Sequence, residues 1–227
     1  MRQLWRDPKL RAVMAASVTL GFAVGVFAIS FGVAAVSAGA SVAQACAMSL
    51  LIFTGASQFS AVSVISSGGS PLAAFGGAAV LAARNGVYGL AMAPHLTGRL
   101  GTRLVAAQIT IDESTAMAAA QDDPVHRRAA FWITGTSVYV FWNLGTLAGA
   151  LLGTSIDPKT YGLDAAVPAA FVAILFPLLR RRVSALAAIT GAVVCVVLIP
   201  LVPVGVPILC ATVGVLFGLP EPKGVAE

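Results

Sequence analysis

Residues 12–37 read AVMAASVTLGFAVGVFAISFGVAAVS, a stretch without a charged side chain, and they set the class of fold. The uncharged sequence continues through Ala83 and ends only at Arg84. A helix needs about 20 apolar residues to cross a bilayer, so this stretch is long enough for more than two crossings. The ranges 129–156 and 183–220 also lack Asp, Glu, Lys and Arg.

The composition agrees with a membrane protein. The 227 residues are 58% hydrophobic and 10% charged, with a mean hydropathy of +0.91, whereas soluble domains carry about 25% charged residues. In lipid every backbone N–H and C=O must be paired within the protein, so the apolar segments should be helices. We therefore predict an all-α, polytopic transmembrane bundle. Because no composition shift marks a soluble part, we treat 1–227 as one transporter domain.

We expect about 7–8 membrane segments, some of them broken or re-entrant. The seven apolar segments are 13–37, 42–66, 71–94, 129–153, 164–179, 183–200 and 203–219. Segment 42–66 is interrupted by the small and polar run 54–58, and segment 164–179 contains Pro168. Segment 100–121 is ambiguous, because Asp112 and Glu113 stand at its middle.

Basic residues give the orientation, because cytoplasmic loops are enriched in Lys and Arg. The basic N-terminal segment, the pair Arg127-Arg128 and the run 180–182 should all be cytoplasmic. Because the N-terminal segment and Arg127-Arg128 lie on the same side, an even number of crossings must separate them. Either segment 100–121 crosses the membrane, giving eight crossings, or segment 42–66 is re-entrant. The sequence leaves both arrangements open, with eight crossings preferred. We expect a multi-pass protein of the cell inner membrane.

Several function classes lack support in the sequence. The net charge of +5 comes from clusters that flank apolar segments, so we expect no nucleic-acid partner. HExxH, Walker A and GxSxG motifs are missing, and we do not expect an enzyme. The three cysteines and two histidines have no metal-ligand spacing, so no metal or cofactor is expected. These residues are Cys46, Cys195, Cys210, His95 and His126.

Ionisable residues within apolar segments are the first candidates for a site, because burial in lipid is costly for them. They are Arg84, Asp112, Glu113 and Asp164. A buried arginine needs a counter-charge, so we expect Arg84 to pair with Asp112 or Glu113. Adjacent helical residues point about 100° apart, which leaves the second acid free to titrate. A structural ion pair is the alternative, and Asp164 can simply favour a helix start.

The interrupted run is the second candidate. A broken helix frees backbone groups, and the N-terminus of a half-helix suits an anion. Gly55, Ser57 and Gln58 would contribute to such a site, and Trp142 with its neighbour Asn143 could line the same cavity. The alternatives are polar contacts between helices for the run and an interfacial anchor for the tryptophan.

Several strings together resemble the AzlC-type branched-chain amino acid exporters. Residues 48–59 (MSLLIFTGASQF) are similar to the family's SLLVFAGAAQF, residues 84–89 (RNGVYG) to RHLLYG, and residues 112–114 (DES) to DET. The segment Gly162–Phe171 resembles GLDFALPALF, and Trp142 with its following glycines fits the intervening span. The matches run in order over about 21–177.

The resemblance implies the large subunit of a two-component exporter of branched-chain amino acids, driven by the proton gradient or membrane potential. It also implies a small AzlD-type membrane subunit as partner. Asn85 replaces the histidine that follows the family's arginine, and Ala82 replaces an asparagine, so the substrate could differ. The alternatives are a permease subunit of an ATP-driven system, an intramembrane enzyme and a non-transporting assembly factor.

Overall fold

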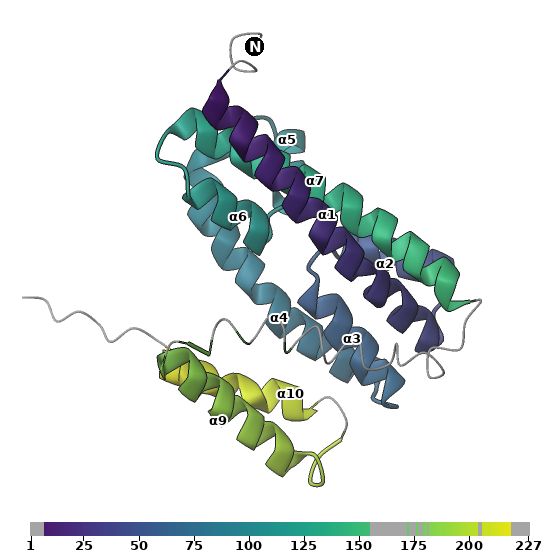
Figure 1. The fold of residues 1–227 in the computed structure, drawn as a ribbon. Coiled ribbons are helices and arrows are strands. Elements are labelled where there is room, and N and C mark those ends of the chain that lie inside the picture. Colours follow the sequence, from purple (N-terminus) through teal and green to yellow (C-terminus); the bar gives the residue numbers. More distant parts are fainter. Residues whose placement is uncertain are drawn as a thin grey trace, which may run out of the picture.

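The structure is a computed structural model that describes residues 7–154, 172, 176, 179–180, 182–203 and 206–218. This part of the chain contains helices and no strand (Figure 1), which confirms the predicted all-α fold. Its elements are α1 (Pro8–Ser37), α2 (Val42–Leu51), α3 (Ala56–Ser66), α4 (Pro71–Met92), η2 (Ala93–His95), α5 (Leu100–Gln108), α6 (Asp112–Ala119), α7 (Pro124–Gly153), α9 (Arg182–Leu198), α10 (Val206–Ala211) and η4 (Thr212–Gly218). Most of predicted segment 164–179, including Asp164 and Pro168, lies outside the described residues.

The helices fall into two length classes. α1 and α7 have 30 residues each and α4 has 22, which correspond to about 45 Å and 33 Å. A hydrocarbon core is about 30 Å thick, so each is long enough to cross it. Of the helices in the described residues, α1 alone is both long enough and apolar enough to be a candidate span. α2, α3, α5 and α6 have 8–11 residues and reach about half that thickness.

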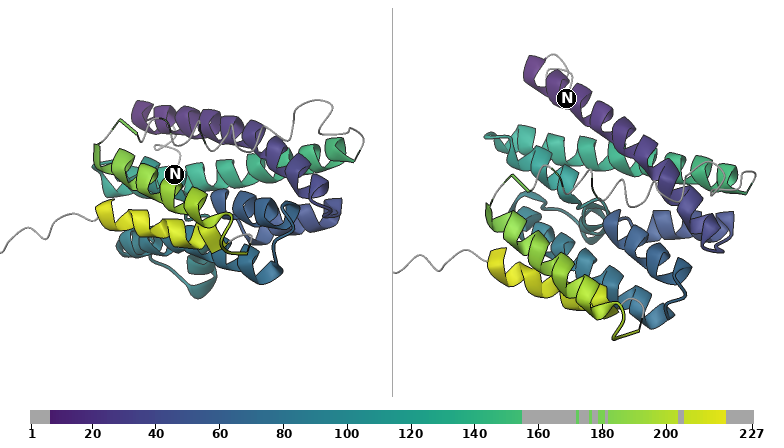
Figure 2. Two further views of the ribbon diagram at one scale, coloured as in Figure 1. Left: turned by 90° about the horizontal axis from the view of Figure 1, so that it is seen from below. Right: turned by 60° about the horizontal axis from the view of Figure 1, so that its bottom comes forward.

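α1 and α7 lie side by side and run in the same direction (Figures 1 and 2). Gly21 lies against Ser137, Gly25 against Phe141, and Gly32 against Ala150, so residue numbers increase together along both helices. The side-chain oxygens of Ser17 and Thr134, both fully buried, are 2.8 Å apart and add a polar contact. Close packing of backbones through small residues is the usual way in which helices associate in membranes.

The tightest contacts come from glycines of α7. A Cβ added to Gly149 would overlap the carbonyl oxygen of Ile29, and one added to Gly145 would overlap that of Gly25. Because these obstacles are backbone atoms of a long helix, no side-chain rotation can relieve the overlap.

We predict that Gly149→Ala destabilises the protein by roughly 1–3 kcal/mol, as overpacking in a filled interior does. The matched control is Gly86→Ala in the middle of α4, where an added Cβ meets no atom within 4 Å. The melting temperature of detergent-solubilised protein should fall for the first variant and stay the same or rise for the second. Equal melting temperatures would contradict the tight α1–α7 contact.

His126 joins the starting ends of these two helices. Its Nε2 lies 2.8 Å from Asp7 Oδ2, and its Nδ1 lies 2.8 Å from Asp123 Oδ2. Each aspartate also caps its own helix, since Asp7 accepts from the N–H of Lys9 and Asp123 from that of His126. Two ionised carboxylates only accept hydrogen bonds, so both ring nitrogens must donate, and the imidazole must carry two protons.

The charges around His126 shift all three pKa values. Hydrogen bonds to Asp123 and Asp7 raise the pKa of His126 above its ordinary 6.5. Hydrogen bonds from backbone N–H groups and from His126 lower the pKa of Asp7 and Asp123 below 3.8. The imidazolium therefore stabilises the folded state below pH 6.5 and this stabilisation is lost as the pH rises through its raised pKa. The carboxylates stabilise it above 3.8, until acid protonates them through their lowered pKa values.

We predict that the melting temperature falls as the pH is raised from 6.5 through the raised pKa of His126, because deprotonation breaks one of its two carboxylate contacts. His126→Gln should flatten this dependence. His95→Gln is the control, because His95 contacts Arg127 and no acid in the described residues. The idea is wrong if His126→Gln keeps the pH dependence of the unchanged protein.

Candidate functional site

The segment that carries the two acids turns back on itself. Before α5, the ring nitrogen Nε2 of His95 lies 3.4 Å from Arg127 Nη1, and after α6, the carbonyl of Gln121 accepts from Arg127 Nε and Nη2 at 3.1 and 2.8 Å. Both ends of 95–121 thus meet at the start of α7. Between α5 and α6 the side chain of Ile109 packs against Gly135, further along α7. The preferred interpretation, that 100–121 crosses the membrane, is wrong, because two helices of half length form a hairpin.

Segment 42–66 forms a hairpin at the opposite end. α2 begins next to the end of α1, where the N–H of Ala40 bonds to the carbonyl of Ala35. α3 ends at the turn that precedes the start of α4. The C-terminal end of α4 continues into η2, where His95 contacts Arg127. Both ends of 42–66 therefore lie at the end of the bundle away from Arg127 (Figure 1). This agrees with the second arrangement left open by the sequence.

The predicted interruption is present but begins earlier than the run 54–58. α2 ends at Leu51 and α3 starts at Ala56, so Ile52–Gly55 are the non-helical residues and Ser57 and Gln58 lie in the first turn of α3. Gly55 has φ of +60°, a conformation that L side chains rarely adopt. A glycine at this position lets the chain reverse between α2 and α3.

The tips of the two hairpins meet inside the bundle. Gln108 Nε2, at the end of α5, donates to the carbonyl of Leu50 at 2.9 Å, and the Tyr139 hydroxyl donates to the same oxygen at 3.1 Å. Arg84 Nη2 on α4 donates to the carbonyl of Thr54 at 3.5 Å. Carbonyls at a helix C-terminus lack an intrahelical partner, so these side chains supply the hydrogen bonds that the broken helix leaves open.

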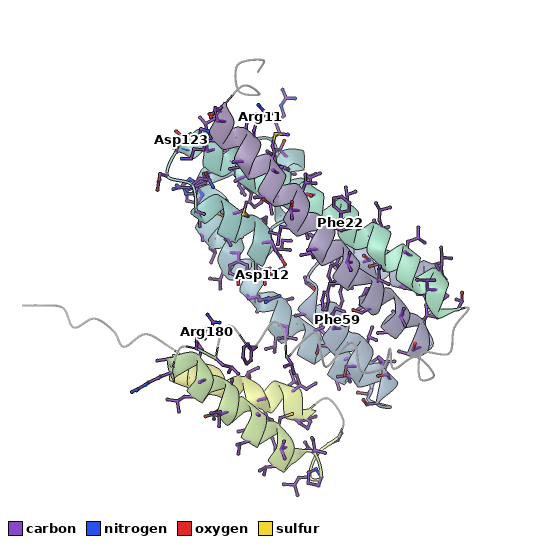
Figure 3. All side chains as sticks on the ribbon, in the orientation of Figure 1. Arg11, Phe22, Phe59, Asp112, Asp123 and Arg180 are labelled. Atoms are coloured by element: carbon purple, nitrogen blue, oxygen red, sulfur yellow. The ribbon has the colours of Figure 1, made fainter. Side chains whose placement is uncertain are left out.

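A cavity of about 370 Å³ lies where the tips meet, within the range of small-molecule sites. Figure 3 places Asp112 midway along the bundle, between Asp123 at one end and Phe59 on α3. The first residues of α3 and of α6 both line the cavity, so two helix N-termini converge on it. The lining residues are Ala23, Val24, Phe27, Phe53, Thr54, Gly55, Ala56, Arg84, Ile111, Asp112, Glu113, Val138 and Trp142.

Arg84 and the two acids form the charged end of the cavity. Arg84 Nη1 lies 3.1 Å from Asp112 Oδ2, which confirms the predicted pairing and selects Asp112 over Glu113. The side chains of Arg84 and Asp112 are 37% and 46% exposed, so both remain accessible. Glu113 lines the cavity without an ion-pair partner in the described part of the chain. The rest of the lining is mostly apolar, with aromatic rings from α1, hairpin 42–66 and α7.

Other predicted residues have different positions. Gln58 is fully buried, and its side chain accepts from the N–H of Gly55 and donates to the carbonyl of Met48. These two hydrogen bonds connect α2 with the start of α3 across the break. Ser57 Oγ and Asn85 Oδ1 are buried and have no hydrogen-bond partner among the described residues. Trp142 is 3% exposed and lies in the core beside the cavity, so it is not an interfacial anchor.

Two parts of this site were not evident from the sequence pattern. One is the aromatic wall of Phe27 and Phe53, which looked like any other apolar residues. The other is the helix start at Asp112, which makes the second N-terminus. A signal for it exists in the β-branched run 109–111 directly before the acids, because such residues favour helices weakly.

Comparison with known proteins identifies the family. The family model described as AzlC protein matches residues 19–156. The chain belongs to the AzlC family. The chain is also similar to the branched-chain amino acid transport protein AzlC of Bacillus subtilis (strain 168), with 24% identity over 220 residues, 95% of this chain and 84% of that protein. No solved structure matches.

The AzlC match runs from Thr19 within α1 to the end of α7, and it includes every residue that lines the cavity. α9, α10 and η4 lie outside it. Membership in this transport family, together with the apolar helix α1, places the chain in a membrane.

We predict that Thr97→Cys and Asp122→Cys, which flank hairpin 100–121, react with an impermeant thiol reagent from the same side of oriented vesicles. Ser67→Cys, exposed in the turn before α4, should react from the other side. The native cysteines Cys46, Cys195 and Cys210 are first replaced by alanine. Labelling of Thr97→Cys and Asp122→Cys from opposite sides would mean that the segment crosses the membrane.

Proposed function

We propose that this protein is a secondary transporter that exports branched-chain or similar small hydrophobic amino acids. It acts as the large subunit of a two-component exporter, with an AzlD-type small membrane subunit and the proton gradient as energy source. The observation that carries this proposal is the cavity that combines one cation, two acids and an apolar aromatic wall. The amino-acid transport named for the Bacillus subtilis relative supports it.

The chemistry of the cavity suits a zwitterion with an apolar side chain. Arg84 is the partner for the substrate carboxylate, and guanidinium groups bind carboxylates with paired hydrogen bonds. The N-termini of α3 and α6 add partial positive charge that favours the same anion. The acids Asp112 and Glu113 place negative charge beside Arg84, where the ammonium group would lie. Phe27, Phe53 and Trp142 provide the apolar surface for the side chain.

The remaining predicted residues have supporting roles in this proposal. Gly55 allows the break and Gln58 holds it, while Ser57 and Asn85 carry buried oxygens without a hydrogen-bond partner among the described residues. Asp164 is proposed on the sequence alone.

The proposed orientation is a multi-pass protein of the cell inner membrane with a cytoplasmic N-terminus. Lys9 and Arg11 flank the start of α1, while Arg127 and Arg128 flank the start of the parallel helix α7. Basic residues gathered at one end of a bundle favour the cytoplasmic side. In this orientation both ends of hairpin 100–121 lie on the cytoplasmic side, and both ends of hairpin 42–66 lie on the outer side.

We predict that Asp112→Asn lowers leucine counterflow into proteoliposomes by about tenfold or more, because Arg84 loses its counter-charge in a membrane interior. The proteoliposomes contain the chain with its AzlD-type partner. The control is Asp122→Asn, the same substitution at an exposed residue at the end of the bundle, which should leave counterflow unchanged. Equal activity of both variants would contradict a functional role for the Arg84–Asp112 pair.

A further inference from the structure

The two neighbouring acids of α6 have unlike environments. Asp112 is held by Arg84 at 3.1 Å, whereas Glu113 has no cationic partner of its own among the described residues. Both line the cavity, and so does Arg84. The lining residues from α1, from hairpin 42–66 and from α7 contribute no titratable side chain. Among the described residues, the charged groups that line the cavity beside Glu113 are Arg84 of α4 and Asp112 of its own helix.

A carboxylate in this position requires a cation. An ionised side chain within a membrane protein is costly unless it is paired. The single positive charge of Arg84 is already balanced by Asp112, so Glu113 adds an excess negative charge to the cavity. Two cations are available in the proposed function, the ammonium group of the amino acid and a proton.

We propose that Glu113 is the coupling residue, whose carboxylate holds either a proton or the ammonium group of the substrate, but never both. This inference rests on the proposed function and assigns its energy coupling to one side chain. When the site faces outward, a proton binds the carboxylate and releases the amino acid. When the site faces inward, the carboxylate loses its proton to the cytoplasm and a new ammonium group takes its place.

The exchange balances charge and atoms. The proton adds to one Glu113 oxygen as the ion pair with the ammonium group breaks, and no bond within the amino acid changes. Because the substrate is a zwitterion with no net charge, each cycle moves one amino acid out and one positive charge in. Export is then driven by both the proton gradient and the membrane potential.

Asp112 has the separate task of positioning Arg84. Successive side chains on a helix point about 100° apart, so Asp112 can hold the guanidinium while Glu113 faces the cavity. A substrate carboxylate that binds Arg84 then brings its α-ammonium group to the adjacent acid. The spacing of an α-amino acid, with one carbon between its two charged groups, fits one cation and one acid at the same end of a cavity.

The first test is the pH dependence of ligand binding to the purified complex. Leucine affinity should fall by up to about tenfold for each pH unit below the titration of Glu113, because protons compete with the ammonium group. 4-Methylpentanoate, which lacks the ammonium group, should not lose affinity in acid. Glu113→Gln should bind leucine more weakly and without this pH dependence, and Glu113→Asp should restore it. The proposal fails if Glu113→Gln keeps the pH dependence.

The second test separates this inference from the proposed function. At leucine concentrations raised to offset its weaker binding, Glu113→Gln should exchange leucine for leucine across proteoliposomes without a gradient, but a pH gradient should no longer drive leucine accumulation. If the unchanged protein shows no leucine exchange, the proposed function is wrong. If it exchanges leucine and Glu113→Gln still accumulates it against a gradient, only the assignment of Glu113 is wrong.

A third measurement needs no variant. Addition of leucine to the unchanged, weakly buffered complex should release protons near the titration of Glu113, whereas 4-methylpentanoate should not. Leucine binding without proton release at any pH at which leucine is a zwitterion would overturn the proposal.

Discussion

Arg84 is the side chain on which the interior of this protein depends. Its guanidinium contacts the carbonyl of Thr54 on one hairpin and the carboxylate of Asp112 on the other. The backbone groups of a broken helix find no hydrogen-bonding partner in lipid, so the chain itself must supply one at each tip. Arg84, Gln108 and Tyr139 do this for the tip of hairpin 42–66, and Ser114 does it for the tip of hairpin 100–121. The hydrogen bond from Gln108 to Leu50 brings the two tips together. The cavity exists because these contacts hold two helix N-termini side by side.

The fold combines one pair of long, closely packed helices, α1 and α7, with two hairpins of short helices. α1 and α7 pack through glycines so closely that backbone touches backbone, and the aspartates beside His126 tie their starting ends. The hairpins 42–66 and 100–121 pack against this platform from opposite ends. Their tips join through polar contacts, and both hairpins also pack through buried apolar residues, among them Phe53 and Ile111.

The cavity joins this architecture to the function proposed for it. Its lining carries one cation and two acids together with the aromatic rings of Phe27, Phe53 and Trp142. The segment shared with the AzlC family encloses the whole cavity and stops before α9. Every residue that lines the cavity thus lies within the part of the chain that matches the family model. Glu113, the acid without a partner, gives the cavity a place where a proton and a substrate cation can compete.

The sequence by itself determined the fold class and the candidates. Apolar stretches such as 12–37 can only be helices in lipid, and Arg84, Asp112 and Glu113 were visible because charges are rare there. It also located the break near Gly55. It did not decide whether 100–121 crosses the membrane, which of the two acids pairs with Arg84, or that Phe27 and Phe53 face them. Those answers depend on contacts between residues far apart in the chain, such as His95 and Gln121 with Arg127. Hydropathy measures only how favourably each residue transfers from water to lipid. Where the chain turns back therefore depends on the tertiary structure.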